Sequence, residues 1–198
     1  MIPPRVFLLS PANCGGERAG LLFSPRASFD LARRLRTAEG VTLGEVFSFL
    51  SSLYFRGKLA YAERFGVPLV ITPNAGLRPP DDHVTLASLR ASARVDIHAA
   101  NARYRGPLLA SARAVAETLG PDAPVTLLGS IASEKYVGVL LDVFGERLTF
   151  PPAFVGRGDM SRGGLLLRAV RAGVELDHVP VAGAVRHGPR PPRLAPVR

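Results

Sequence analysis

Short, almost wholly apolar runs recur along the chain at Val6–Leu9, Val67–Thr72 and Val125–Leu128. Consecutive apolar positions are typical of strands that are buried on both faces of a parallel sheet. Each run is followed by Gly, Pro, Ser or Asn residues, which favour loops. The pattern therefore predicts three strands, and we expect them to lie next to one another at the centre of one sheet.

Segments with helical periodicity separate these runs. The expected helices are Ala27–Arg36, Thr42–Leu53, Arg56–Phe65, Val84–Ala93, Gly106–Leu119, Ser133–Phe144 and Met160–Ala172, with short strands at Arg147–Phe150 and Leu176–Val181. Thr42 and Glu45 have the spacing of a capping box at a helix start. Apolar strands that alternate with helices predict an α/β fold, a three-layer sandwich with a largely parallel central sheet and helices on both faces.

Length and composition indicate one domain followed by a tail. The 198 residues fall in the usual range of about 100–200 residues for a domain. Composition changes only near Gly183, after which the chain is rich in proline and contains arginines but no acidic residue. We expect a single α/β domain over residues 1–182 and a basic tail over residues 183–198 that makes few contacts with the core.

The charge balance is strongly basic. Lys plus Arg is 25 against 16 for Asp plus Glu, giving a formal net charge of +9, and Lys58 and Lys135 are the two lysines. Arginine pairs with phosphate through two hydrogen bonds and stacks on bases, so the excess favours a nucleic acid or nucleotide partner. A general enrichment in Arg, Ala, Gly and Pro would produce the same excess without such a partner, and both readings stay open.

The length of the apolar runs and the cysteine and histidine content bear on the protein's location and on metal binding. No apolar run approaches the roughly 18–20 residues of a membrane helix, and the apolar stretch Val6–Leu9 is shorter than a signal peptide needs. We therefore expect a soluble, cytoplasmic protein without membrane contact. A single cysteine, Cys14, excludes an internal disulfide and a cysteine-based zinc site, and the four histidines form no metal-spaced pair. No metal or cofactor is expected.

Candidate chemistry lies in loops. Residues 10–16, 73–82 and 129–133 each follow a predicted strand, and ligands of parallel α/β sheets collect at that edge. The stretch Gly156–Gly164 is rich in glycine, carries Arg157 and Arg162, and opens a helix. Exposed amides, the helix dipole and guanidinium groups would together bind an anion. It matches neither a Walker A loop nor a dinucleotide-binding fingerprint, and the alternative is a flexible loop with a helix cap.

Three further features have structural alternatives. Cys14 could be a nucleophile, but no histidine stands at a diagnostic spacing, and a thiol without a role is favoured. Asp81 could be a general base, although adjacent acids in a Pro-rich loop are more often solvated. Tyr54 and Phe55 could stack on bases beside Lys58, or belong to the core.

Five motifs occur in an order that is similar to one family. They are Leu8–Asn13, Phe55–Lys58, Gly76–Asp81, Ile131–Tyr136 and the helix start Arg162-Gly163. On these motifs the chain resembles the YaaA family of peroxide-stress-resistance proteins, although Asn13 stands where that family has a lysine. The resemblance implies an intracellular α/β protein with an electropositive cleft, DNA binding and a link to oxidative damage.

These observations support three hypotheses. The first is a nucleic-acid-binding protein, with phosphate contacts from Ser10, Asn13, Lys58, Arg78, Lys135, Arg157 and Arg162. The second is an enzyme acting on a nucleobase or nucleotide, of the glycosidic-bond hydrolase or transferase type, with Asp81, Ser133 and Tyr136 as catalytic residues. The third is a scaffold protein whose tail binds an acidic partner.

Overall fold

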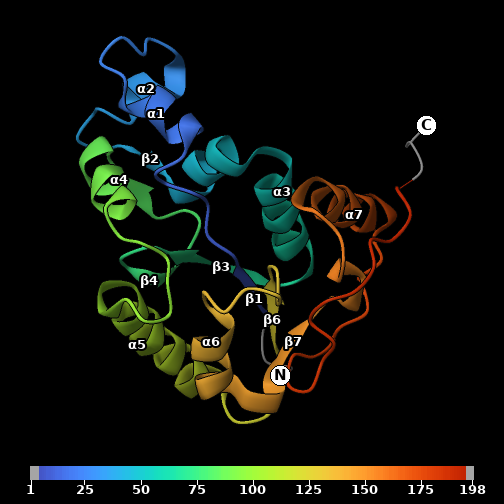
Figure 1. Cartoon of the computed structure of the whole chain (residues 1–198). Helices are drawn as coiled ribbons and strands as arrows, with labels where there is room; N and C mark the ends of the chain where they lie inside the picture. Colours follow the sequence, from blue (N-terminus) through green and yellow to red (C-terminus); the bar gives the residue numbers. More distant parts are fainter. Residues whose placement is uncertain (1–4, 195–198) are drawn as a thin grey trace.

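A six-stranded sheet forms the centre of the computed structural model, which describes residues 5–194 (Figure 1). Its order is β4 (Gly76–Arg78), β3 (Val67–Thr72), β1 (Val6–Leu9), β6 (Val125–Leu128), β7 (Leu148–Phe150) and β8 (Val179–Pro180). The four inner strands are parallel, and β4 and β8 run antiparallel at the two edges. The prediction that three apolar runs form adjacent central strands is confirmed.

Strand β1 explains why these runs are apolar at every position. Its four residues are all buried. Phe7 and Leu9 belong to the hydrophobic core on one face of the sheet, whereas Val6 and Leu8 belong to the core on the other. Successive side chains of a strand point to opposite faces, so a strand that is covered on both sides has no polar position.

Helices cover both faces, which confirms the predicted α/β architecture. One core is built with α1 (Glu17–Phe23), α2 (Asp30–Arg34), α3 (Leu43–Phe65), α4 (Leu86–Ala93) and α7 (Asp159–Ala172), and the other with α5 (Ala102–Leu119) and α6 (Val137–Phe144). Two 3-10 turns, at Gly145–Arg147 and Pro152–Phe154, and a small antiparallel pair of β2 (Val41–Thr42) with β5 (His83–Val84) complete the described elements.

Helix α3 is broken at Ser52. This residue has φ 50° and ψ −129°, and it is the one non-glycine residue with positive φ among residues 5–194. The break separates the two helices that the sequence predicts, and the Thr42 side chain caps the first by accepting a hydrogen bond from Glu45 N. Ser51 before the break and Tyr54 after it line the same cavity. The strained residue therefore positions two parts of one site.

The second half of α3 packs directly on α7 (Figure 1). A Cβ atom at Gly57 would lie 2.7 Å from the carbonyl oxygen of Gly163, and a Cβ atom at Gly163 would lie 2.8 Å from the carbonyl oxygen of Leu53. Glycine is required because the two backbones touch there. The contact fixes the first turns of α7 against the middle of α3.

Some element boundaries differ from the predictions. The sequence analysis missed α1, because only Ala19 and Leu22 are buried in this short helix and two positions do not establish a period. Helix α5 begins before Gly106, at Ala102, because the Asn101 side chain caps it. Helix α6 begins at Val137, so Ser133 lies in the preceding loop.

The segment 183–194 has no regular secondary structure but contacts the domain. Arg186 pairs with Glu134 at 2.6 Å, and the Arg157 guanidinium donates to the carbonyl of Pro192 at 3.2 Å. Gly156, with φ 71°, lies against the backbone of Pro189. The expectation that the tail makes few contacts with the core is therefore wrong for residues 183–194. This segment contacts the domain through an ion pair, a hydrogen bond from an arginine to its backbone, and backbone packing. Residues 195–198 lie outside the described residues.

We predict that Gly57→Ala lowers the melting temperature, with a loss of about 1–3 kcal/mol, because the new methyl group overlaps the Gly163 backbone. Thermal unfolding measures the change. The matched control is Gly106→Ala, where nothing lies within 4 Å of the new Cβ and higher helix propensity should stabilise by about 0.5–1 kcal/mol. Equal responses of the two variants would contradict the close helix contact.

Candidate functional site

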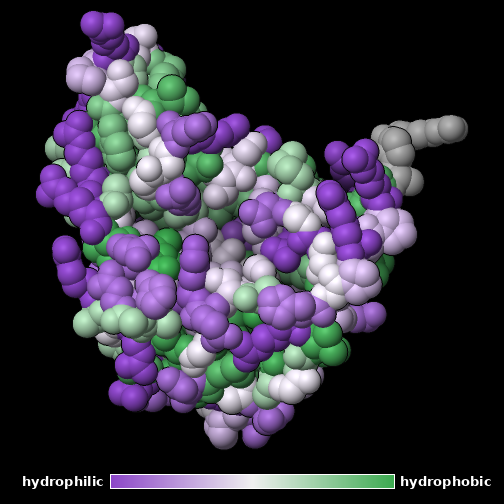
Figure 2. Space-filling view, in the orientation of Figure 1, coloured by the Kyte–Doolittle hydropathy of each residue, from purple (hydrophilic) through white to green (hydrophobic). Residues whose placement is uncertain are grey.

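A cavity of about 670 Å³ opens at the carboxyl edge of the sheet. The chain runs from β1 to β3 on one side and then returns to β6 on the other, so the loops after β1 and β6 diverge there, and such switch points are where α/β folds bind ligands. Figure 2 shows a hollow in this face with hydrophilic residues along much of its rim. The lining comprises residues 10–15, Ser51, Tyr54, Pro73, residues 92–97, Ser130, Ser133, Lys135, Tyr136, Asp159 and Arg162.

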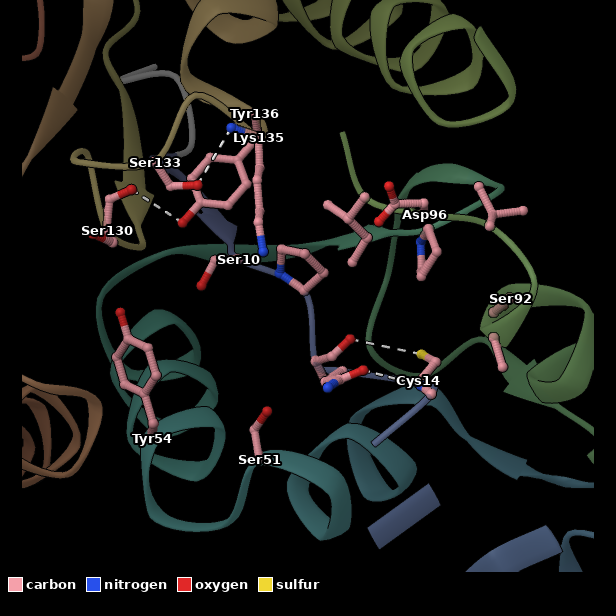
Figure 3. A pocket seen from close by; sticks show the side chains of 18 of the residues that line it. Ser10, Cys14, Ser51, Tyr54, Ser92, Asp96, Ser130, Ser133, Lys135 and Tyr136 are labelled. Atoms are coloured by element: carbon pink, nitrogen blue, oxygen red, sulfur yellow. Dashed lines mark hydrogen bonds between the residues drawn. The ribbon is translucent and has the colours of Figure 1, made fainter. Parts of the chain in front are cut away.

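The polar side chains fall into two groups (Figure 3). Ser10, Tyr54, Ser130, Ser133 and Tyr136 gather at one end of the cavity. Cys14, Ser92 and Asp96 lie at the other end, and the Lys135 side chain extends between the two groups.

Arg162 supplies a buried cation at the first end. It lies in the first turns of α7 and is 9% exposed. Its Nε donates to the carbonyl of Phe154 at 3.2 Å, and Nη2 donates weakly to Ser130 Oγ at 3.5 Å. Its carboxylate partner, Asp159, is 3.4 Å away with a side chain 70% exposed, so the pair is long and well solvated. The guanidinium charge is therefore only partly neutralised by its one carboxylate partner among the described residues.

Lys58 lies beneath the same end of the cavity and is 1% exposed. Its Nζ is 2.7 Å from the carbonyl oxygen and 2.8 Å from the Oγ of Ser10, and it forms no ion pair with a described residue. Desolvation lowers the pKa of Lys58 to about 7. The negative charge of Asp159 acts against this shift, whereas the positive charge of Arg162 adds to it. The Tyr54 ring centroid is 4.4 Å from Nζ, and a desolvated cation–π contact is worth about 2 kcal/mol or more, which offsets part of the several kcal/mol that burial costs an ammonium.

Tyr54 brings a buried hydroxyl, close to the Arg162 guanidinium, to this group. Its OH is buried and has no hydrogen-bond partner among the described residues, whereas the OH of Tyr136 donates to the carbonyl of Ser130 at 3.1 Å. Burial raises the pKa of both tyrosines, and Arg162 opposes the rise. Tyr54 therefore remains a neutral donor, one turn before Lys58 on the same side of α3.

The structure brings together most of the residues that the sequence singled out. Ser10, Asn13, Ser133, Lys135, Tyr136 and Arg162 line the cavity, and Lys58 lies directly behind Ser10. Their roles in catalysis or phosphate binding stay predictions.

Three predicted site residues lie elsewhere. Arg78 is on β4, which turns back antiparallel to β3, and its guanidinium pairs with Asp82 beside a separate, smaller cavity. Asp81 is exposed in the loop after β4 and does not line the central cavity. The guanidinium of Arg157 points away to Ala153, Ser161 and Pro192. The expectation that Asp81 and Arg78 reach this edge is wrong because the chain reverses over residues 73–75 and β4 then runs back along β3, away from the edge.

Sequence reasoning missed several cavity residues. Ser51 and Asp96 line it without having been singled out, and Ser130 and Asp159 lie within the candidate loops 129–133 and Gly156–Gly164 but were given no role. Tyr54 was left open between base stacking and the core. Ser130 directly follows a predicted strand, so its position was available as a signal. Asp96 belongs to a stretch between helices, and no local pattern connects that stretch to the sheet edge.

The surroundings of Cys14 agree with the interpretation that its thiol has no catalytic role. The side chain is buried, and burial raises the pKa of the thiol to about 12, which leaves almost no thiolate at neutral pH. Residues 5–194 contain no group of three or more His, Cys, Asp or Glu side chains arranged to hold a metal ion. None of the helices in that range is long and apolar enough to cross a membrane.

No family model, curated protein or solved structure matches this chain.

The buried amine predicts a specific pH dependence. The pKa of Lys58, about 7 in the folded chain, lies below its ordinary 10.5, so between these values the unfolded chain binds more protons and the free energy of unfolding rises with pH. Above about pH 9 the raised pKa of Cys14 has the opposite effect on the free energy of unfolding, because the unfolded chain then binds fewer protons at this thiol than the folded chain does. Denaturant titrations of wild type and Lys58→Met should diverge by about 2 kcal/mol from pH 7 to 9, in favour of wild type. Parallel curves would mean that Lys58 is charged throughout.

Proposed function

We propose that this protein binds a nucleotide in the central cavity, with the phosphate held by Arg162. The observation that carries the proposal is the buried guanidinium of Arg162 in the cavity lining, whose charge is only partly neutralised by the long, solvated pair with Asp159. Arginine matches phosphate through paired, charge-assisted hydrogen bonds. A phosphate would supply the missing negative charge and accept from the buried hydroxyl of Tyr54.

The surroundings of Arg162 favour an anion. Helix α7 begins at Asp159, so the positive end of its dipole lies at the same place. Lys135 and Arg94 add cationic side chains to the lining, against Asp96 and Asp159. Together with Lys58 behind the wall, basic groups outnumber acidic ones around the cavity.

The size and the second end of the cavity favour a nucleoside attached to that phosphate. A volume of about 670 Å³ falls within the range of about 300–1,000 Å³ for small-molecule sites. Val95 and Ile97 contribute apolar surface near Ser92 and Asp96. Apolar faces for a planar ring, with a few polar groups at its edge, suit a nucleobase. The motifs that resemble the YaaA family supply Ser10, Asn13 and Tyr136 to the lining, and the DNA binding that this resemblance implies is in keeping with a ligand that carries phosphate.

Binding by Arg162 is tested with mononucleotides and nucleosides in thermal-shift and calorimetric titrations. Wild type should be stabilised by nucleoside monophosphates more than by the nucleosides themselves, because only the former carry the phosphate. Arg162→Ala should weaken nucleotide binding about 10- to 100-fold, corresponding to the loss of charge-assisted hydrogen bonds.

The matched control is Arg171→Ala, an exposed arginine near the end of the same helix, which should leave binding unchanged. Equal binding by wild type and Arg162→Ala, or stabilisation by nucleosides alone, would overturn the proposal.

A second candidate, nucleic acid binding, is favoured by a separate groove beside α7. Arg157, Arg168, Arg190 and Arg193 line a hollow of about 360 Å³ that has no acidic residue among its described lining residues. The segment 190–194 forms one wall and the first turns of α7 form the other. A concentration of guanidinium groups along a groove suits a phosphate backbone, which arginine binds without reading the bases.

Filter binding of single- and double-stranded DNA at two salt concentrations tests this groove. The double variant Arg190→Ala/Arg193→Ala should bind more weakly, and the slope of log affinity against log salt should fall by about 1–2. Arg33→Ala, an exposed arginine on α2, is the control and should keep the wild-type slope. Absence of binding at low salt, or an equal effect of both variants, would contradict a role for the groove.

A further inference from the structure

We propose that Ser10 is a nucleophile and that Lys58 is the general base that activates it. The two side chains are in direct contact, with Lys58 Nζ 2.8 Å from Ser10 Oγ. Ser10 lines the cavity, whereas Lys58 is closed off from it, so a bound molecule meets the hydroxyl and not the amine. This arrangement of a hydroxyl and a buried base is what an activated nucleophile requires.

The hydrogen bonds around Lys58 suit a neutral amine. Such an amine has two N–H groups and one lone pair. One N–H can donate to the carbonyl oxygen of Ser10 at 2.7 Å, which leaves the lone pair to accept the hydroxyl proton of the same residue. The charged or titratable groups that influence Lys58 from α7 are Asp159, which favours the protonated form, and Arg162, which disfavours it, while Tyr54 and Phe55 of its own helix present their rings.

The backbone around Ser10 is rigid, which a nucleophile also needs. Ser10 directly follows β1, and its N–H donates to the carbonyl of Leu128 at 3.2 Å. A Cβ atom at Gly129 would lie 2.8 Å from the Cβ of Ser10, so the neighbouring strand end is in contact with it and only glycine fits there. Figure 3 shows the Ser10 hydroxyl between Tyr54 and the Ser130–Tyr136 loop. The nucleophile is thus held on the sheet rather than on a free loop.

The substrate class rests on the proposed function, because a phosphate held by Arg162 belongs to the same end of the cavity. The substrate is then a phosphate ester. Ser10 Oγ attacks phosphorus, Lys58 takes the hydroxyl proton, and the bond between phosphorus and the leaving oxygen breaks with its electron pair staying on that oxygen. The leaving oxygen takes a proton from the solvent that reaches the open cavity, and Lys58 stays protonated behind Ser10. The products are a phosphoserine ester and an alcohol.

The second half of the reaction uses the same lysine as the acid. A water molecule attacks the phosphorus of the Ser10 ester and gives a proton to the cavity solvent, and the bond from Oγ to phosphorus breaks with its electron pair staying on Oγ. Lys58 returns its proton to Oγ, which restores the serine and releases the phosphate. Arg162 and the buried hydroxyl of Tyr54 are the donors available for the charge that develops on the phosphoryl oxygens.

Diisopropyl fluorophosphate tests the pair directly, because an activated serine displaces its fluoride and keeps the phosphoryl group. The experiment incubates the full chain with this reagent and locates the adduct by peptide mass spectrometry. Wild type should carry one adduct, on Ser10, and its rate of formation should rise through pH 7 as Lys58 loses its proton. Ser10→Ala should form none, and Lys58→Met should react at least about 100-fold more slowly.

Ser28→Ala is the matched control, because Ser28 is an exposed serine that does not line the cavity, and it should react like wild type. Thermal unfolding shows whether the Lys58→Met variant is folded. If it is not, the pH profile of Ser10 labelling in the wild type still supports or overturns the Ser10–Lys58 pair. Equal rates in wild type and folded Lys58→Met, an adduct on another serine, or a rate without a rise near pH 7 would overturn the pair.

The same reagent separates this inference from nucleotide binding. Labelling of Ser10 in a protein that nucleotides do not stabilise supports the pair and overturns the phosphate ester as its substrate. Stabilisation by nucleotides without labelling overturns the pair and leaves the binding proposal standing.

Discussion

The contact between Gly57 and Gly163 determines what the cavity can do. Each glycine is adjacent in sequence to a buried cation, Lys58 on α3 and Arg162 on α7. Because the two helices touch through their backbones, these cations are brought to the same end of one cavity. A larger residue at either glycine would separate the helices. The close packing of these two helices and the electrostatics of the site therefore have one origin.

Two positive groups in a poorly solvated place repel each other, and the only described carboxylate that pairs with Arg162 there is the exposed Asp159. Arginine keeps its proton at any ordinary pH, so the repulsion falls on the lysine and adds to the desolvation that lowers its pKa. An anion on Arg162 would act in the opposite direction and raise the pKa of Lys58. Phosphate binding and the proton affinity of the amine are thus coupled: a bound phosphate makes Lys58 a stronger base and at the same time raises the pH above which Lys58 is neutral.

The fold followed from the sequence where burial dictated every position. Val6–Leu9, Val67–Thr72 and Val125–Leu128 are apolar because helices cover both sides of the sheet, and their loops had to meet at one edge. Arg162 could be found because a Gly-rich helix start is a local pattern. Arg78 and Asp81 were misplaced because the antiparallel turn over residues 73–75 removes them from that edge, and Lys58 was read as a phosphate ligand because local sequence does not reveal complete burial.

The site is built at the expense of stability. Ser52 adopts positive φ, which costs about 1–3 kcal/mol for such a residue, the hydroxyl of Tyr54 is buried without a partner, and Lys58 is buried without a carboxylate. Each feature conflicts with what a core selected for stability alone would contain, and all three occur within seven residues of α3. Local conflicts of this kind concentrate where function constrains the chain. A ligand that accepts a hydrogen bond from Tyr54 and neutralises the charge of Arg162 would relieve part of this cost. The stability lost in building the site would then reappear as part of the free energy of ligand binding.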